Sequence, residues 1–300
     1  MHSNGLPNQA VCEELGYRMP DDEMLPDVDP FPFARVIWNS PEAMEQWGPI
    51  VNRARAVHDL AEYEMVRQGA RRCATLHISP QDYDRMIERI TRDKLVWLPI
   101  VRTRNYNGFS HKHFPVETLG PNTSVYGVLA TNLEDAEAFR GASNARKVDH
   151  LAIGELLGFP KCCCEAFVKW WPTYYDPVYQ AAIASPHEVL KIESNYSTLL
   201  VEPHVATHQM LRYAGFRLTS HFPCRLDCEA SIEVGKTWLE VARKADPQGL
   251  DALLQVLALP GEWSVLHGIV VVETPHFTVL TNSMPTKRKW AVRWRSVRGY

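Results

Sequence analysis

Leu156-Leu-Gly-Phe-Pro-Lys-Cys-Cys-Cys-Glu-Ala-Phe167 is the stretch that most strongly shapes the expected fold of this chain. A later segment, His221-Phe-Pro-Cys-Arg-Leu-Asp-Cys-Glu-Ala230, has the same form. In each segment an aromatic residue and a proline are followed closely by cysteine and then by a predicted helix. Five of the seven cysteines of the chain lie in these two segments, so their arrangement is the first feature to explain.

The cysteines are expected at two helix starts. Pro160 is expected in the first turn of one helix and Asp227 at the N-cap of the other. Helix N-termini present unpaired N–H groups and a partial positive charge, and both stabilise the thiolate that binds metal. The pattern therefore predicts one shared metal centre with four ligands: Cys162, Cys163, Cys224 and Cys228.

Cys164 is predicted to lie outside this set. Successive residues of a helix point about 100° apart, so three adjacent cysteines do not all face one ion. Cys164 precedes the apolar helix positions Phe167 and Val168, which favours packing in the core. The plain alternative is that all these cysteines are buried core residues, since free cysteine is among the most buried residue types. Two matched Pro–Cys segments favour the metal interpretation.

The spacing bears on which metal is bound. Cys224 and Cys228 have the separation of a zinc knuckle. The adjacent Cys162 and Cys163 favour an iron–sulfur cluster, because each can bind a different iron. We therefore expect a [4Fe–4S] cluster, with zinc as the alternative.

The two segments resemble an uncharacterised prokaryotic domain family with a motif Leu-Gly-Tyr-Pro-x-Cys-Cys-x-x-x-Phe and a later Pro-Cys-x-x-Asp-Cys. Here these motifs read Leu157 to Phe167 and Pro223 to Cys228, with Phe159 in place of the tyrosine and Cys164 as an additional cysteine. The likeness covers about residues 150–240. It implies the same four cysteines as the ligand set, and it implies no particular reaction.

Two histidines are candidate catalytic residues. His221 lies three residues before Cys224, where it can be a ligand, a hydrogen-bond donor or a proton carrier beside the centre. A loop histidine explains it equally well. His150 begins the helix that leads into the first cysteine segment, and a simple helix start is again the alternative.

Composition restricts the class of protein. The 300 residues are 45% hydrophobic and 22% charged with a net charge of −3, which is ordinary for a globular protein and gives no general attraction to nucleic acid or anionic membranes. The longest apolar runs, such as 268–272, are far too short to cross a bilayer. The first 18 residues lack a secretory pattern, so a cytoplasmic location is expected, where cysteines serve metals or redox chemistry rather than disulfide frameworks.

Periodicity predicts a mixed α+β fold. Residues 1–33 are expected to form an extended arm, and 34–148 to alternate strands and helices with some parallel pairing. Helices are expected to start at Ser40-Pro41, at Ser79-Pro80, at Asn132 and at Asp149. Residues 149–258 are expected to be almost wholly helical, with helices at 187–194 and 204–214 among others. Residues 259–300 are expected to return to strands that pack back on the α/β part.

We weighed two main functions. The first is a metalloenzyme, an oxidoreductase or lyase acting on a small-molecule substrate at the four-cysteine centre, with no membrane partner and with nucleic acid as a disfavoured but open alternative partner. The aromatic run 170–175 supports a pocket beside the centre, although core packing explains it as well. The second is a zinc-stapled, non-catalytic protein that binds RNA or a protein partner through the basic, tryptophan-containing stretch 287–295. A metal-free thiol redox enzyme ranks last, because adjacent cysteines form disulfides only with strain.

Overall fold

A computed structural model describes residues 34–105, 115–171, 176–186, 188–193, 196–265 and 268–282. The expected N-terminal arm 1–33, the polar loop with His111 and His113, and the basic C-terminal stretch 287–295 lie outside these ranges. So do residues 172–175 of the aromatic run.

The described residues form the mixed α+β fold that the sequence predicts. The strands are β1 (Arg35–Trp38), β2 (Cys73–Ile78), β3 (Val96–Arg104), β4 (Thr123–Ala130), β5 (Glu188–Glu193), β6 (Tyr196–Val201), β7 (Gly261–Ser264), β8 (Ile269–Glu273) and β9 (Phe277–Asn282). The helices are α2 (Pro41–Arg67), α3 (Tyr83–Arg92), α4 (Leu133–Asn144), α5 (His150–Leu156), α6 (Lys161–Trp170), α7 (Pro177–Ile183), α8 (Glu229–Ala245) and α9 (Pro247–Leu257). A short 3₁₀ turn covers Arg212–Ala214.

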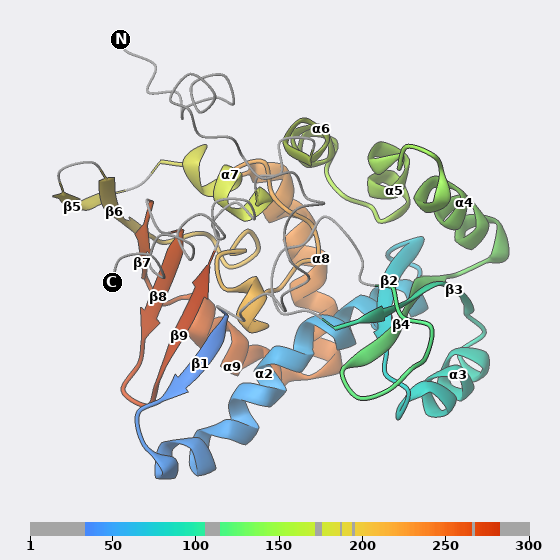
Figure 1. Cartoon of the computed structure of the whole chain (residues 1–300), viewed down its shortest axis with the longest axis horizontal. Coiled ribbons are helices and arrows are strands. Elements are labelled where there is room, and N and C mark those ends of the chain that lie inside the picture. The colour runs from blue at the N-terminus through green and yellow to red at the C-terminus, as the bar shows by residue number, and fades with distance from the viewer. Residues whose placement is uncertain are drawn as a thin grey trace.

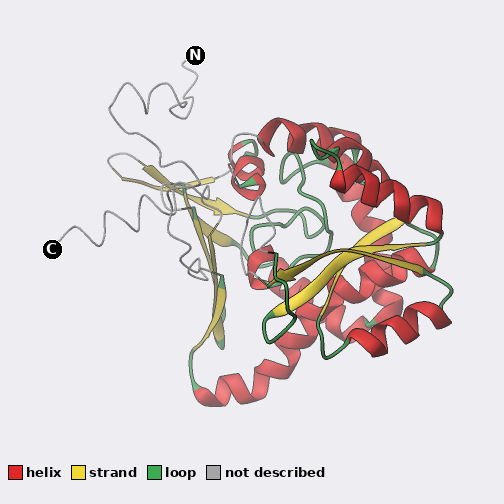
Figure 2. Ribbon diagram, turned by 45° about the vertical axis from the view of Figure 1, so that its right-hand side comes forward, coloured by secondary structure: helices red, strands yellow, loops and turns green. Residues whose placement is uncertain are grey.

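The strands build two antiparallel sheets. Six strands pair in the order β1-β9-β8-β7-β6-β5, and three in the order β2-β4-β3. The two sheets lie on different sides of the molecule, with the long helix α2 running between them (Figures 1 and 2). β1 and β2 precede and follow α2 in the chain, so this one helix connects the two sheets.

The expected parallel pairing within 34–148 is wrong. β2, α3 and β3 do follow one another as a strand–helix–strand unit, but β4 inserts between the two strands and pairs antiparallel with both. The backbone N–H and C=O groups on the facing edges of β2 and β3 bond to β4, instead of to each other as in a parallel β2–β3 pair. The local sequence pattern predicted the strands and the helix of this part. The position of β4 between β2 and β3 depends on contacts between residues far apart in the sequence.

Two expected helices in the middle of the chain are also wrong. Residues 188–193 and 196–201 form a hairpin that joins the six-stranded sheet through β6 and β7. Residues 204–214 form turns and the short 3₁₀ segment. Here the Thr207 hydroxyl donates to the carbonyl of His204, and Gly215 has a φ of 93°. Local side-chain bonds of this kind compete with helix formation, and the left-handed glycine ends the segment.

Several helix starts follow the sequence signals. Ser40 accepts from the Ala43 N–H with Pro41 as the first helical residue, and Asn132 and Asp149 cap α4 and α5 in the same way. α3 begins at Tyr83, later than the predicted start at Ser79-Pro80, because the Ser79 hydroxyl and the Asp82 carboxylate bond to each other across the preceding turn.

The largest core lies around α2, α8 and α9. α2 buries Val51, Ala54, Val57 and Ala61, one residue per turn, and Trp238 of α8 is 1% exposed in the same cluster. Burying a side chain of that size stabilises the fold by several kcal/mol, on the order of 3–5. This packing fixes where α8 begins, and therefore where the second cysteine segment lies. No helix among the described residues is long and apolar enough to cross a membrane.

Two helical glycines test this packing. A Cβ at Gly235 in α8 would overlap Ala206 Cβ, whereas a Cβ at Gly141 in α4 would meet nothing within 4 Å. We expect Gly235→Ala to lower the free energy of unfolding by about 1–3 kcal/mol, the usual cost of overpacking. Gly141→Ala should raise it by about 0.5–1 kcal/mol, because alanine favours helix. Denaturant unfolding of both variants checks this, and equal effects of the same sign would contradict the described contact of α8 with residue 206.

Candidate metal centre

The two cysteine segments meet at the starts of α6 and α8. Cys162 and Cys163 lie in the first turn of α6, and Pro160 is the N-cap of that helix rather than a residue of its first turn. Cys228 is itself the N-cap of α8. Asp227 therefore does not cap the helix as expected, and its carboxylate instead pairs with Arg225 at 2.7 Å.

The four predicted ligands come together. The Sγ of Cys163 is 3.7 Å from that of Cys228, and the Sγ of Cys162 is 3.8 Å from both Cys163 and Cys228. Cys224 completes the group, since its Sγ lies within 4.8 Å of the other three. Its backbone N–H also donates to Cys163 Sγ at 3.4 Å. The arrangement is compatible with metal binding, and it joins segments about 60 residues apart in sequence.

The centre is open on one side. Cys162 is exposed and Cys224 is half-buried, whereas Cys163 and Cys228 are buried. Cys164 points away from the group, as predicted: its Sγ is 3.8 Å from the carbonyl of Phe159 and packs where a side chain at Gly154 would stand. Cys164 thus packs between α6 and α5, whereas Cys162 and Cys163 face the start of α8.

Electrostatics favour thiolate at Cys228 and a proton at Cys163. Burial by itself would raise the pKa of Cys228, but hydrogen bonds from Ser231 outweigh burial and lower that pKa to about 7. Burial, which disfavours the charged thiolate, raises the pKa of Cys163 and of Cys224, the latter to about 12. Repulsion from the neighbouring cysteine sulfurs raises both pKa values further. Without a cation, the group therefore keeps most of its protons.

His221 reaches the centre through Ser231. The Ser231 hydroxyl lies 3.2 Å from Cys163 Sγ and 2.8 Å from His221 Nε2. His221 is buried, and burial together with nearby Arg71 and Arg212 lowers its pKa to about 3. The histidine is thus a neutral group one hydrogen bond removed from the sulfurs. His150 packs edge-on against Phe167 and Trp171 at 5.2 and 5.1 Å between ring centroids, and no hydrogen bond to the described cysteines is present.

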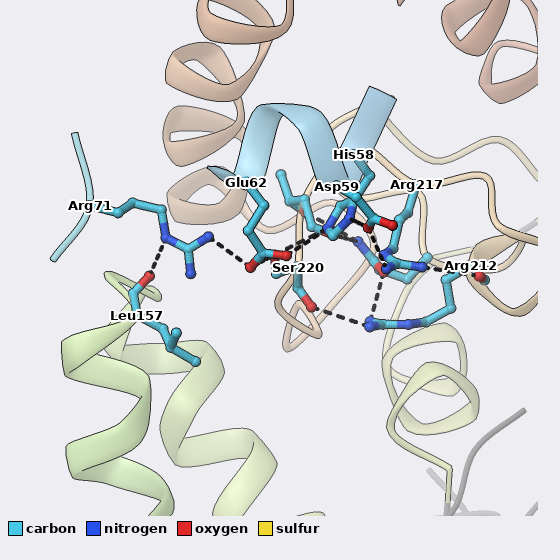
Figure 3. Close-up of polar contacts among 10 residues, drawn as sticks. His58, Asp59, Glu62, Arg71, Leu157, Arg212, Arg217 and Ser220 are labelled. Carbon is cyan, nitrogen blue, oxygen red and sulfur yellow. Dashed lines mark hydrogen bonds and ion pairs between the residues drawn. The ribbon is translucent and has the colours of Figure 1, made fainter. Parts of the chain in front are cut away.

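A buried ion pair supports both cysteine segments from behind. The Arg71 guanidinium pairs with Glu62 at 3.1 Å and donates from Nε to the carbonyl of Leu157 at 2.8 Å, as Figure 3 shows. It also lies over the rings of Phe159 in the first segment and Trp238 in α8. The Glu62 carboxylate in turn accepts from Ser220, the residue before His221, at 2.7 Å. One ion pair therefore contacts the lead-in to each pair of cysteines.

A second group of metal-ligand residues, His58, Asp59 and Glu62, lies on α2. Glu62 is paired with Arg71, and Asp59 lies 3.6 Å from Arg217. Arginines on the carboxylates oppose a further cation, so this group is the weaker metal candidate.

Sequence reasoning missed Ser231, Arg71 and Glu62. Ser231 follows Cys228 by three residues on one helix face, and that spacing was a usable signal. Arg71 and Glu62 lie about 90 residues before the first cysteine segment, where no local pattern marks them.

Comparisons with protein-family models, with curated proteins and with solved structures gave no match. The resemblance to an uncharacterised prokaryotic family stays a prediction from the two motifs.

The support from Arg71 can be measured. Arg71→Met leaves Glu62 buried without its partner, so we expect a loss of about 3–5 kcal/mol in stability and weaker metal retention under competition with a chelator. The matched control is Arg89→Met in α3. This change removes an ion pair of 3.1 Å with Glu64, which lies on α2 like Glu62, and no hydrogen bond or ion pair joins Arg89 to the described residues of either cysteine segment. Metal analysis after dialysis against a chelator checks this. Equal metal loss in both variants would contradict the assigned role of Arg71.

Proposed function

We propose that the four cysteines hold one tetrahedral metal ion, zinc or a single iron, and that this ion fixes the loop 204–228 against α6. The observation that carries the proposal is the separation of the sulfurs. In tetrahedral coordination the distance between two ligand atoms is about 1.6 times the metal–ligand distance. Thiolate sulfurs bound to one ion at about 2.3 Å therefore lie about 3.8 Å apart. The three sulfurs of Cys162, Cys163 and Cys228 lie 3.7–3.8 Å apart.

The [4Fe–4S] expectation demands a wider arrangement. In a cluster each cysteine binds a different iron, and the sulfurs point outward from the corners of the core. They would have to separate well beyond the spacing in this structure, and the starts of α6 and α8 would have to move apart. Arg71 opposes that movement, because it donates to Leu157 and lies over Phe159 in the first segment and also lies over Trp238 of α8. The single ion is therefore better supported.

Four protein ligands point to a structural role for the ion. Structural sites have four side-chain ligands, whereas catalytic zinc keeps a position open for water or substrate. The loop that would be fixed has little regular structure, and it buries polar residues such as Thr207, Gln209 and Thr219. The apolar side chains of Met210, Phe216 and Leu218 anchor the middle of this loop in the core, and the ion would anchor its C-terminal end at Cys224 and Cys228. Chemistry at the metal itself would require Cys162, the exposed member, to leave.

Metal analysis tests the proposal. Protein purified under anaerobic, reducing conditions should contain one zinc or one iron per chain and no acid-labile sulfide. Single replacements Cys163→Ser and Cys228→Ser should abolish metal retention, because each removes a buried ligand. Cys164→Ser is the matched control in the same run of cysteines and should retain the metal.

The outcomes separate the alternatives. Four irons with four sulfides per chain would support the cluster and overturn the single ion. A protein that is metal-free after this purification would overturn both. Cobalt(II) titration of the apoprotein should give the intense thiolate charge-transfer bands of a tetrahedral site. Weak octahedral bands would count against four sulfur ligands.

A further inference from the structure

A serine, a histidine and an aspartate form a continuous chain on the other side of the loop. His58 Nε2 lies 3.1 Å from the Ser220 hydroxyl, and His58 Nδ1 lies 2.8 Å from Asp59 Oδ1 (Figure 3). Each ring nitrogen thus faces a different partner, in the order of a nucleophile, a base and a carboxylate that orients the base. The metal proposal uses none of these three side chains.

The environment of His58 suits a proton acceptor. Its side chain is buried and stacks on Trp238, with ring centroids 5.3 Å apart. Burial lowers the pKa of His58, and the Arg217 charge adds to that effect. The Asp59 carboxylate fixes the proton on Nδ1. The Asp59 side chain is largely exposed, and the hydrogen bond with His58 together with the Arg217 charge lowers its pKa to about 2. Nε2 therefore presents its lone pair to Ser220 at neutral pH.

The Ser220 hydroxyl has a second acceptor. Glu62 Oε1 lies 2.7 Å from Ser220 Oγ, and Arg71 neutralises that carboxylate at 3.1 Å. The hydroxyl has one proton and donates it to Glu62 in this structure, so transfer of that proton to His58 Nε2 requires rotation of the hydroxyl toward the ring.

Positive charge lies beside the serine. The Arg212 guanidinium is held by Gln209 Oε1 at 2.9 Å, by the Ser220 carbonyl at 3.3 Å and by the face of Phe222. It makes no ion pair with any carboxylate of the described residues. Arg217 Nε is buried without a hydrogen-bond partner among them. Arg217 also pairs with Asp59 at 3.6 Å. The positive charge of the two arginines next to the serine fits a substrate that carries an anionic group, or the oxyanion of an acyl-transfer intermediate.

We propose that Ser220, His58 and Asp59 form a nucleophilic site that hydrolyses esters of anionic acyl compounds. Ser220 Oγ bonds to the acyl carbon while its proton passes to His58 Nε2. The bond to the alcohol then breaks, and the alcohol leaves with that proton. Water, losing a proton to the same nitrogen, attacks the acyl-serine and releases the acid, after which the proton returns to Ser220 Oγ.

The proposal goes beyond the metal centre and is independent of the metal bound there. Ser220 directly precedes His221, so a fixed loop positions the nucleophile, but the ion takes no part in the chemistry. Loss of metal and loss of nucleophilicity are therefore separate readouts.

A fluorophosphonate probe tests the site, because serine displaces its fluoride only when activated. The metal-containing protein should be labelled at Ser220, as read by peptide mass spectrometry. His58→Gln should slow labelling by about 100-fold or more, the usual contribution of a general base. Asp59→Asn should also slow it, since the imidazole loses the carboxylate that orients it. Ser124→Ala is the matched control: the hydroxyl of Ser124 lies 3.1 Å from His77 Nδ1, and its removal should leave labelling unchanged.

Metal content and thermal melting of each variant separate a chemical effect from misfolding. Labelling that is absent from the folded protein, or that persists in Ser220→Ala or His58→Gln, would overturn the proposal. As a second readout, the p-nitrophenyl monoester of succinate should be hydrolysed faster than p-nitrophenyl acetate, and Arg212→Gln should remove the difference. Equal hydrolysis of the two esters by the unaltered protein would overturn the anionic substrate class.

Discussion

Contact between Cys163 and Cys228, 3.7 Å apart and 65 residues apart in sequence, is the constraint on which the rest of the structure depends. Sulfurs this close cannot all be thiolates without a cation, because like charges at this distance repel strongly. The group either keeps its protons or binds a metal. Helix N-termini and Ser231 stabilise negative charge on one side of it, which prepares the group for the second state.

The long helix α2 ties this centre to the rest of the molecule. Its apolar face packs on α8 and α9, and its polar residues His58, Asp59 and Glu62 face the loop that carries Ser220 and His221. The buried pair of Glu62 and Arg71 then reaches both cysteine segments. Buried ion pairs contribute little net stability but are costly to break, so this pair acts mainly to fix geometry. Metal centre and serine site consequently share one support.

Local chemistry made much of this predictable. Helix starts at Ser40, Asn132 and Asp149 followed from capping residues, and the four-cysteine set followed from two matched segments. Cys164 was separable from its neighbours because helix periodicity turns it away. The mixed α+β class followed from the change of period along the chain.

Long-range choices were not predictable. The local pattern of 187–194 predicts a helix, but residues 188–193 pair as a strand with β6, which in turn pairs with β7. No local sequence pattern indicates that β4 pairs between β2 and β3. Asp227 looked like a cap, but Cys228 takes that position and Arg225 binds the aspartate. Ser220, Glu62 and Arg71 come from distant parts of the chain, so only the fold reveals their contact.

X-ray absorption fine structure of the metal-loaded protein tests the central claim most directly, because it reports the ligands and neighbours of the bound metal. A single tetrahedral ion on the four cysteines gives one shell of four sulfurs at about 2.3 Å and no neighbouring metal. A second shell from metal atoms, or a first shell with fewer sulfurs and added nitrogen or oxygen, would contradict it.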